Sequence, residues 1–338
     1  SLKGRVNRAM NTIKHVCQIS EEEWHEFFEE LSNAEKKANS DAIEKELFDN
    51  DEFDFSLFKG KDAFSLNFDY LEEIYWSAGQ KLSPFICDIR EGILKNLNCS
   101  KTIVAEFGQA YWLDKRHGFT PNVTASHTTT PELFTSCGIP IQPINTIGCC
   151  KAYDTKVGTH NFITKIDHLS DPLGQKLAKL EYGTSTGRQR MVGWFDAVEK
   201  GNTLRYEGFK QIVINKLDAL TLNRPKSNED LKICVAYKSN DGKILKDVPR
   251  SEKIHKTLFP VYETMSGWEE DLSQIQSFEK LPIAAKRYIS RMISSMIECA
   301  YPDGYEKSIL PKVRFLGVGP SPGQIISDIP DTIELIKY

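Results

Sequence analysis

Two arginines lie two residues apart in a stretch rich in glycine and hydroxyl residues, which runs Gly183-Thr184-Ser185-Thr186-Gly187-Arg188-Gln189-Arg190. In an extended loop, two guanidinium groups at this spacing face the same way. Their forked donors match the oxygens of a carboxylate or a phosphate. The pattern predicts an anion-binding loop. A solvent-exposed basic loop without a ligand is the open alternative.

A second group of chemically useful residues is Asn215-Lys216-Leu217-Asp218, which follows the apolar run Gln211–Ile214. An aspartate here can accept hydrogen bonds from the N1–H and the exocyclic amine of guanine, while a lysine stem packs on the purine ring. Adenine does not present the same donors, so this arrangement would select guanine. A surface Lys–Asp pair is the alternative.

Two glycine-containing turns also offer ligand contacts. Gly108 would allow close approach of the backbone to a ligand, and Gln109 and Thr124 offer uncharged hydrogen bonds to a base edge or a phosphate. Gly317 and Gly319 follow the last apolar run and can cradle a ribose or base through backbone groups. An ordinary loop in the first case and a plain turn in the second are the alternatives.

Four short apolar runs must position these groups. They predict strands over residues 103–107, 211–215, 231–237 and 313–318. Helical patterns lie between them, one opened by Trp194, Phe195 and Val198 and one with an apolar face from Ile283 to Met296. Strands alternating with helices predict an α/β fold with a large, mostly parallel central sheet flanked by helices. Ligands of such sheets bind beyond the carboxyl ends of the strands, where the polar residues above are found.

The first part of the chain has a different texture. Residues 20–50 are rich in Glu, Lys and Ala, and their aromatic residues recur at helical spacing, which predicts an amphipathic helix. We therefore divide the chain into a mainly helical segment, residues 1–99, and an α/β region, residues 100–338, which the polar residues above make the expected ligand-binding region. No long linker separates them, so a single cooperative unit is expected.

Composition excludes several classes of protein. The formal net charge is −4, which gives no hint of a nucleic-acid-binding surface. No apolar run reaches about 18 residues, so no transmembrane helix is predicted. The eight cysteines form no C-x-x-C pair, and we interpret them as reduced core thiols of a cytoplasmic protein. The histidines show no paired ligand spacing, so no metal site is identified.

Taken together and in order, these segments resemble the adenylosuccinate synthetase family, continuously over about residues 100–325. The family pattern E-G-A-Q-x-x-x-L-D-x-x-x-G-x-x-P-x-V-T-S-S is largely matched from Glu106 to Ser126. Later patterns are matched by Lys151-Ala152-Tyr153-Asp154-Thr155-Lys156-Val157-Gly158, Ser185 to Asp196, Asn215 to Asp218, Cys234 to Tyr237, and Tyr262-Glu263 with Gly267-Trp268.

This resemblance implies a function. It is a GTP-dependent and Mg²⁺-assisted ligation of L-aspartate to IMP in purine biosynthesis, by a homodimer with a P-loop NTPase-like fold. It also implies site residues. IMP would contact Gln109, Leu113, Thr124, Val157 and Arg188; aspartate would contact Ser185, Thr186, Arg188 and Arg190; GTP would contact Lys216, Asp218, Gly317 and Gly319.

The sequence also departs from the family pattern. The family's first loops carry a Gly-rich phosphate-binding segment, a general-base aspartate and a general-acid histidine, and none of these has a counterpart here. We therefore identify no catalytic residue and expect this chain alone to be inactive. Lys156 stands in place of an arginine near the implied IMP site. A non-catalytic nucleotide-binding relative, a fragment, and a ligase for another purine nucleotide remain alternatives.

Overall fold

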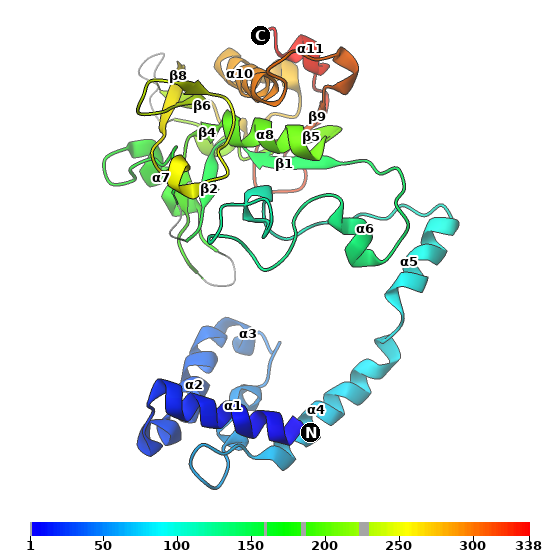
Figure 1. Cartoon of the computed structure of the whole chain (residues 1–338), viewed down its shortest axis with the longest axis vertical. Coiled ribbons are helices and arrows are strands. Elements are labelled where there is room, and N and C mark those ends of the chain that lie inside the picture. The colour runs from blue at the N-terminus through cyan, green and yellow to red at the C-terminus, as the bar shows by residue number, and fades with distance from the viewer. Residues whose placement is uncertain (1, 159–160, 184–186, 223–229) are drawn as a thin grey trace. The chain divides into compact units, whose positions relative to one another are not determined.

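The computed structural model describes residues 2–158, 161–183, 187–222 and 230–338 (Figure 1). The chain divides into two compact units, Ser1–Gly92 and Ile93–Tyr338, and each is described by itself. The sequence analysis expects a boundary after residue 99, and its expectation of a single cooperative unit stays a prediction.

The first unit is helical. Its helices are α1 (Leu2–Cys17), α2 (Glu21–Ala38), α3 (Ser40–Glu44) and α4 (Phe68–Leu82), and α5 (Ile89–Asn98) spans the boundary between the units. Helix α2 begins with a capping box, in which Ser20 and Glu23 each bond the other's backbone N–H. Trp24 and Phe28 on this helix pack with Phe64 in a small aromatic core. These features confirm an amphipathic helix within residues 20–50.

The second unit contains a four-stranded sheet in the order β1-β5-β9-β10. Strands β1 (Ile147–Lys151), β5 (Gln211–Asn215) and β9 (Lys312–Gly317) are parallel, and β10 (Ile325–Ile326) is antiparallel to β9. Ile212, Ile214, Val313 and Leu316 are buried in the main core. Strands β5 and β9 therefore contribute to the main core, whereas β1 is partly exposed.

A second sheet contains β4 (Phe195–Asp196), β6 (Leu231–Lys238), β7 (Ile244–Leu245) and β8 (Phe259–Met265). Strand β4 is parallel to β6, whereas β7 and β8 are antiparallel to it. A separate antiparallel pair joins β2 (Asp154–Lys156) and β3 (Met191–Gly193). The predicted α/β class is confirmed, with mixed sheets flanked by helices.

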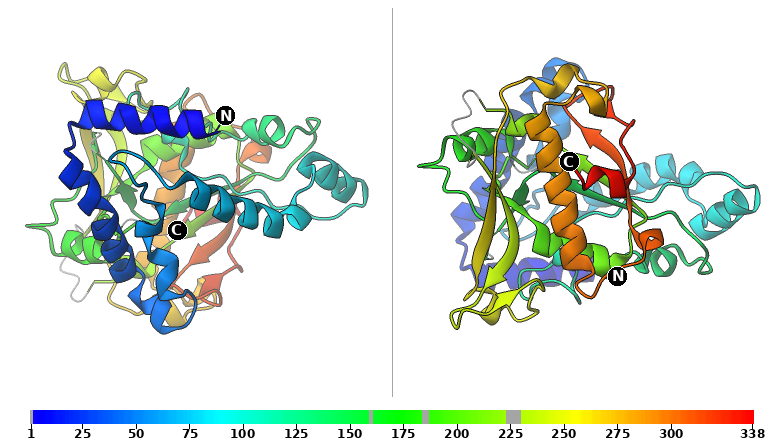
Figure 2. Two further views of the ribbon diagram at one scale, coloured as in Figure 1. Left: turned by 90° about the horizontal axis from the view of Figure 1, so that it is seen from below. Right: turned by 90° about the horizontal axis from the view of Figure 1, so that it is seen from above.

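Helices α8 (Ala197–Glu207) and α10 (Ile283–Ala300) pack against each other. Both views show α10 between the β6–β8 ribbon and β9 (Figure 1; Figure 2, right). At the crossing, a Cβ atom built on Gly201 would lie 2.5 Å from Cys299 Cβ and 2.6 Å from the Met296 carbonyl oxygen. Only glycine allows this approach. The remaining helices of this unit are α6 (Glu132–Cys137), α7 (Pro172–Leu180), α9 (Glu252–His255) and α11 (Thr332–Leu335).

Three of the four predicted strands are confirmed, as β5, β6 and β9, and both predicted helices are confirmed, as α8 and α10. The prediction of a buried strand over residues 103–107 is wrong. The segment has no regular secondary structure, and Val104 is 87% exposed. A short apolar run favours a strand, but a strand also needs a neighbouring strand to pair with. Within the described residues, no strand pairs with this segment.

The interpretation of the cysteines as core thiols is correct only in part. All eight are free, but only Cys234 and Cys299 are buried, and Cys17, Cys87, Cys99 and Cys149 are exposed. The apolar run around Cys234 predicts its burial correctly, but that signal does not extend to the exposed cysteines. Within the described residues, no helix is both long and apolar enough to cross a membrane.

The crossing of α8 and α10 generates a testable prediction. We expect Gly201→Ala to lower the free energy of unfolding by about 1–3 kcal/mol, because the added methyl group overpacks the contact with Cys299 and Met296. Urea unfolding followed by circular dichroism measures this. Gly79→Ala in α4 is the control, since nothing lies within 4 Å of the added Cβ. That control should be neutral or stabilising by up to about 1 kcal/mol, and equal effects of the two substitutions would contradict the close crossing.

Candidate functional site at the carboxyl edge of the parallel sheet

Strands β1, β5 and β9 end at the same edge of the sheet, and the chain continues there into turns and loops. Just beyond β1, the Ala152 amide donates to the Asn215 carbonyl at 2.9 Å. Just beyond β5, the Leu217 amide donates to the Gly317 carbonyl at 3.1 Å. These two bonds hold the three strand ends together, at the edge where α/β proteins bind ligands.

The turn after β5 has an unusual backbone. Lys216 has a φ of 65°, in the left-handed region that non-glycine residues adopt uncommonly. Gly317 lies close beside it, since a Cβ atom there would lie 2.6 Å from Asn215 Oδ1 and 3.2 Å from Asn215 Cα. A Cβ on Gly319 would collide with the side-chain amide of Gln324. Both predicted glycines therefore serve close packing of the turns.

Asp218 is the first residue of a short 3₁₀ helix, η5 (Asp218–Leu220), directly after this turn. Burial raises the pKa of its half-buried carboxyl, although the charges of Lys216 and Lys176 oppose that shift. The Lys176 ammonium, from α7, donates to the Thr221 carbonyl at 2.6 Å. Asp218 therefore lies in a partly desolvated position with cations around it.

Two backbone hydrogen bonds hold the arginine-containing segment against the residues that precede it. The Arg190 amide donates to the Glu181 carbonyl at 3.0 Å, and the Gly183 amide donates to the Arg188 carbonyl at 2.8 Å. Arg188 is exposed and Arg190 is half-buried. Ser185 and Thr186, predicted as aspartate ligands, lie outside the described residues.

The carboxylate of Glu181 joins these segments, although its side chain is only 1% exposed. Its Oε2 accepts from Lys151 Nζ at 2.8 Å and from Arg190 Nη1 at 3.1 Å. Its Oε1 accepts from the Tyr153 hydroxyl and lies 3.3 Å from Lys216 Nζ. The predicted aspartate ligand Arg190 and the predicted guanine ligand Lys216 thus share one buried counter-ion.

The electrostatics of Glu181 follow from these partners. Burial alone would raise the pKa of its carboxyl. The hydrogen bonds from Lys151 and Tyr153 and the positive charges of Lys151 and Lys216 outweigh burial and lower the pKa to about 2. Glu181 is therefore ionised at neutral pH, and three cations surround a single negative charge.

A third group of predicted residues is organised by Asp114, which is fully buried. Its Oδ1 accepts from the amides of Arg116 and His117, at 2.7 and 2.9 Å, and its Oδ2 accepts from the Thr128 amide at 2.7 Å. Burial would raise the pKa of this carboxyl, but the three backbone donors and His127 lower it to about 2. The loop of residues 109–128 is thus wound around one carboxylate.

This winding brings three predicted IMP ligands together. The Thr124 amide donates to the Leu113 carbonyl at 2.8 Å. Ser126 Oγ lies 3.4 Å from both Thr124 Oγ1 and Gln109 Oε1. Gln109 has a φ of 66°, which marks a tight turn.

Val157, the fourth predicted IMP ligand, is exposed just after β2. Its neighbour Lys156 provides the link. The Lys156 ammonium lies over the ring of Phe119 in the 109–128 loop and donates to Glu199 at 2.6 Å. The lysine that replaces the family arginine therefore holds this strand end against the loop.

The sequence analysis missed Glu181 altogether and assigned no role to Lys151, Tyr153 or Asp114. A lone acid at the base of a basic loop was the available signal for Glu181. The K-A-Y and L-D patterns were the signals for the others. None of these signals reveals which distant cation each group meets.

The residues that the structure describes do not form a metal site. No group of three or more Asp, Glu, His or Cys side chains gathers within the described ranges. Glu181 is fully engaged by cations and hydroxyl groups. Nothing in this part of the chain therefore fits Mg²⁺, which prefers free carboxylate and phosphate oxygens.

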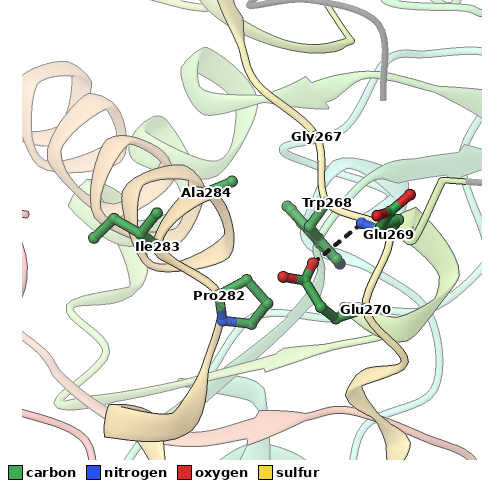
Figure 3. A pocket seen from close by; sticks show the side chains of 7 residues that line it. All are labelled: Gly267, Trp268, Glu269, Glu270, Pro282, Ile283 and Ala284. Atoms are coloured by element: carbon green, nitrogen blue, oxygen red, sulfur yellow. Dashed lines mark hydrogen bonds between the residues drawn. The ribbon is translucent and has the colours of Figure 1, made fainter. Parts of the chain in front are cut away.

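A hollow of about 360 Å³ lies beside Trp268, at the end of the Y-E-x-x-x-G-W pattern (Figure 3). Trp268 Nε1 donates to Thr221 Oγ1 at 3.2 Å, which ties the pattern to the segment after Asp218. The hollow is lined by two carboxylates and no cation, as Figure 3 shows for Glu269 and Glu270. It lacks the charge needed to hold a phosphate, and we do not include it in the site.

Comparison with known proteins gives consistent matches. A family model described as adenylosuccinate synthetase matches residues 27–301. Adenylosuccinate synthetases of Exiguobacterium sibiricum and Caldanaerobacter subterraneus subsp. tengcongensis are 34% and 37% identical over 256 and 259 residues, covering 74% and 75% of this chain. A solved structure of fully ligated adenylosuccinate synthetase from Plasmodium falciparum matches with a TM-score of 0.65 and 27% identity, over 90% of this chain and 65% of that chain.

The fold and the site define an α/β protein with lysine and arginine side chains gathered at the carboxyl edge of parallel strands. The matches give the particular family: the chain belongs to the adenylosuccinate synthetase family. It spans somewhat more than half the length of the two bacterial relatives, 57% and 58%.

The role of Asp114 generates a second prediction. We expect Asp114→Asn to lower the free energy of unfolding at pH 7 by about 1–3 kcal/mol, because the backbone donors lose a charged acceptor. The folded pKa of about 2 lies below the ordinary value of 3.8, so this stabilisation is present above about pH 4 and is lost as the pH falls toward 2. Urea unfolding between pH 7 and pH 3 measures it. Asp303→Asn, on an exposed residue, is the control, and equal stability of the two variants would disprove the role.

Proposed function

We propose that this chain is the nucleotide- and aspartate-binding part of a ligase that joins L-aspartate to IMP at the expense of GTP. The products would be adenylosuccinate, GDP and phosphate. The observation that carries this proposal is the meeting of Arg190 and Lys216 on the buried carboxylate of Glu181, at the carboxyl edge of a parallel sheet. Membership of the adenylosuccinate synthetase family supports it.

The proposed division of labour follows the three groups of residues. Gln109, Leu113, Thr124 and Val157 would bind IMP, and Arg188 would bridge IMP and aspartate. Ser185, Thr186 and Arg190 would hold the aspartate carboxylates. Lys216 and Asp218 would read guanine, with Gly317 and Gly319 keeping the turns close enough for a planar base.

The proposed reaction has two steps. GTP transfers its terminal phosphoryl group to the 6-oxygen of IMP, and the aspartate amine then attacks C6 and displaces phosphate. Phosphoryl transfer depends mainly on positioning and on stabilising charge, which a cluster of lysine and arginine side chains can supply. The residues of this chain would bind and orient the reactants. We assign none of them to proton transfer and no step to Mg²⁺, which would accompany GTP.

The proposed setting is a cytoplasmic homodimer. The dimer rests on the family resemblance. The location rests on the eight free cysteines, which are typical of a reducing compartment.

Guanine recognition can be tested in the chain as it is. We expect GTP to bind more tightly than ATP, and Asp218→Asn to weaken GTP binding by roughly 10–100-fold while leaving ATP binding unchanged, because two charge-assisted hydrogen bonds to guanine are lost. Isothermal titration calorimetry measures both affinities. Asp241→Asn on an exposed turn should bind GTP as the unaltered chain does. Equal affinities of the unaltered chain for GTP and ATP would sink the guanine assignment.

The aspartate assignment makes a separate prediction. With IMP and GDP present, Arg190→Leu should raise the dissociation constant of L-aspartate by about tenfold or more, because a guanidinium–carboxylate contact is lost. Titration calorimetry with L-aspartate measures this change. Arg205→Leu, which removes an exposed partner of Asp247, is the matched control. An unchanged aspartate affinity in Arg190→Leu would remove Arg190 from the site.

A further inference from the structure

We propose that Glu181 is a positioning residue that couples the aspartate and guanine sites, as the shared counter-ion of Arg190 and Lys216. This inference rests on the proposed function for the identity of the two ligands. The contacts themselves are independent of it, because they join three segments that are far apart in the sequence.

Three cations from different parts of the chain meet at the carboxylate of Glu181, which we call the junction. Lys151 reaches it from the end of β1, Arg190 from the segment before β3, and Lys216 from the turn after β5. Oε2 accepts hydrogen bonds from Lys151 and Arg190, whereas Oε1 accepts one from Tyr153 and forms an ion pair with Lys216. A shift of any one donor therefore changes the field that the others experience.

Access to the junction is unequal. The side chains of Lys151, Arg190 and Lys216 are 25%, 34% and 40% exposed, whereas that of Glu181 is 1% exposed. A ligand can therefore reach the cations but not the carboxylate. An arriving anion would act on Glu181 only through the cation that it engages.

The charges predict the sign of the coupling. Three cations meet at one carboxylate and repel one another, although Asp218 also interacts with Lys216. When an aspartate carboxylate engages Arg190, it neutralises one competitor, and Glu181 then holds Lys216 more firmly. A fixed Lys216 stem presents a ready surface to the purine ring, so the two ligands should help each other to bind. Such coupling is reciprocal by thermodynamic necessity.

The ligand-dependent test compares GDP binding with and without saturating L-aspartate, in the presence of IMP, by titration calorimetry. We expect aspartate to lower the dissociation constant of GDP by about fivefold or more in the unaltered chain. This effect should vanish in Glu181→Gln. It should persist in Glu279→Gln, which removes the exposed partner of Lys286. An equal aspartate effect in Glu181→Gln and the unaltered chain would overturn the proposal.

A second test needs no ligand and separates coupling from a merely structural role. Trypsin cleavage after Arg188 and Arg190, followed by mass spectrometry, reports how firmly the segment 187–190 is held. Glu181→Gln should speed this cleavage. Lys216→Met should slow it by roughly two- to fivefold, because Glu181 then has one competitor fewer for Arg190. Lys256→Met, on an exposed i,i+4 pair, should leave the rate unchanged.

The two tests distinguish the possible failures. Acceleration by Glu181→Gln with no slowing by Lys216→Met would overturn the coupling and leave Glu181 a local clamp. Both cleavage effects without any GDP binding by the unaltered chain would support the coupling and contradict the proposed function instead.

Discussion

The parallel pairing of β1, β5 and β9 is the constraint on which the rest of the second unit depends. Lys151 lies opposite Asn215 in the register of β1 and β5, and Gly317 ends the neighbouring strand. Parallel strands end at the same edge of a sheet, so this pairing alone determines that Lys151, Lys216 and Gly317 are neighbours. Buried aliphatic residues on these strands hold the edge rigid beneath the polar side chains.

A rigid edge allows a charge arrangement that a loop could not maintain. Burying a carboxylate is costly unless cations and hydrogen-bond donors compensate it. Glu181 has four such partners, and the cations retain access to solvent. The 109–128 loop also contains a buried carboxylate, that of Asp114. This carboxylate accepts hydrogen bonds mainly from backbone amides, so it shapes the loop without adding charge to its surface.

The sequence predicted the elements whose signal is local. The apolar runs 211–215, 231–237 and 313–318 form strands because each pairs with a neighbouring strand. The run 103–107 forms no strand, because five residues do not determine whether a pairing partner is present. Ordered family patterns named Arg190, Lys216 and Gly317. The counter-ion escaped prediction because Glu181 meets Lys151 and Lys216 across 30 and 35 positions of sequence. A motif identifies the groups available for chemistry, but only the fold determines which of them share a partner.

Strand β1 pairs with β5 on one side, and within the described residues no strand pairs with its other side. The side chains of Ile147 and Cys149 on this strand are exposed. Such an edge accepts any extended segment that offers complementary backbone groups. An extended segment laid along this side would continue the parallel sheet beyond β1.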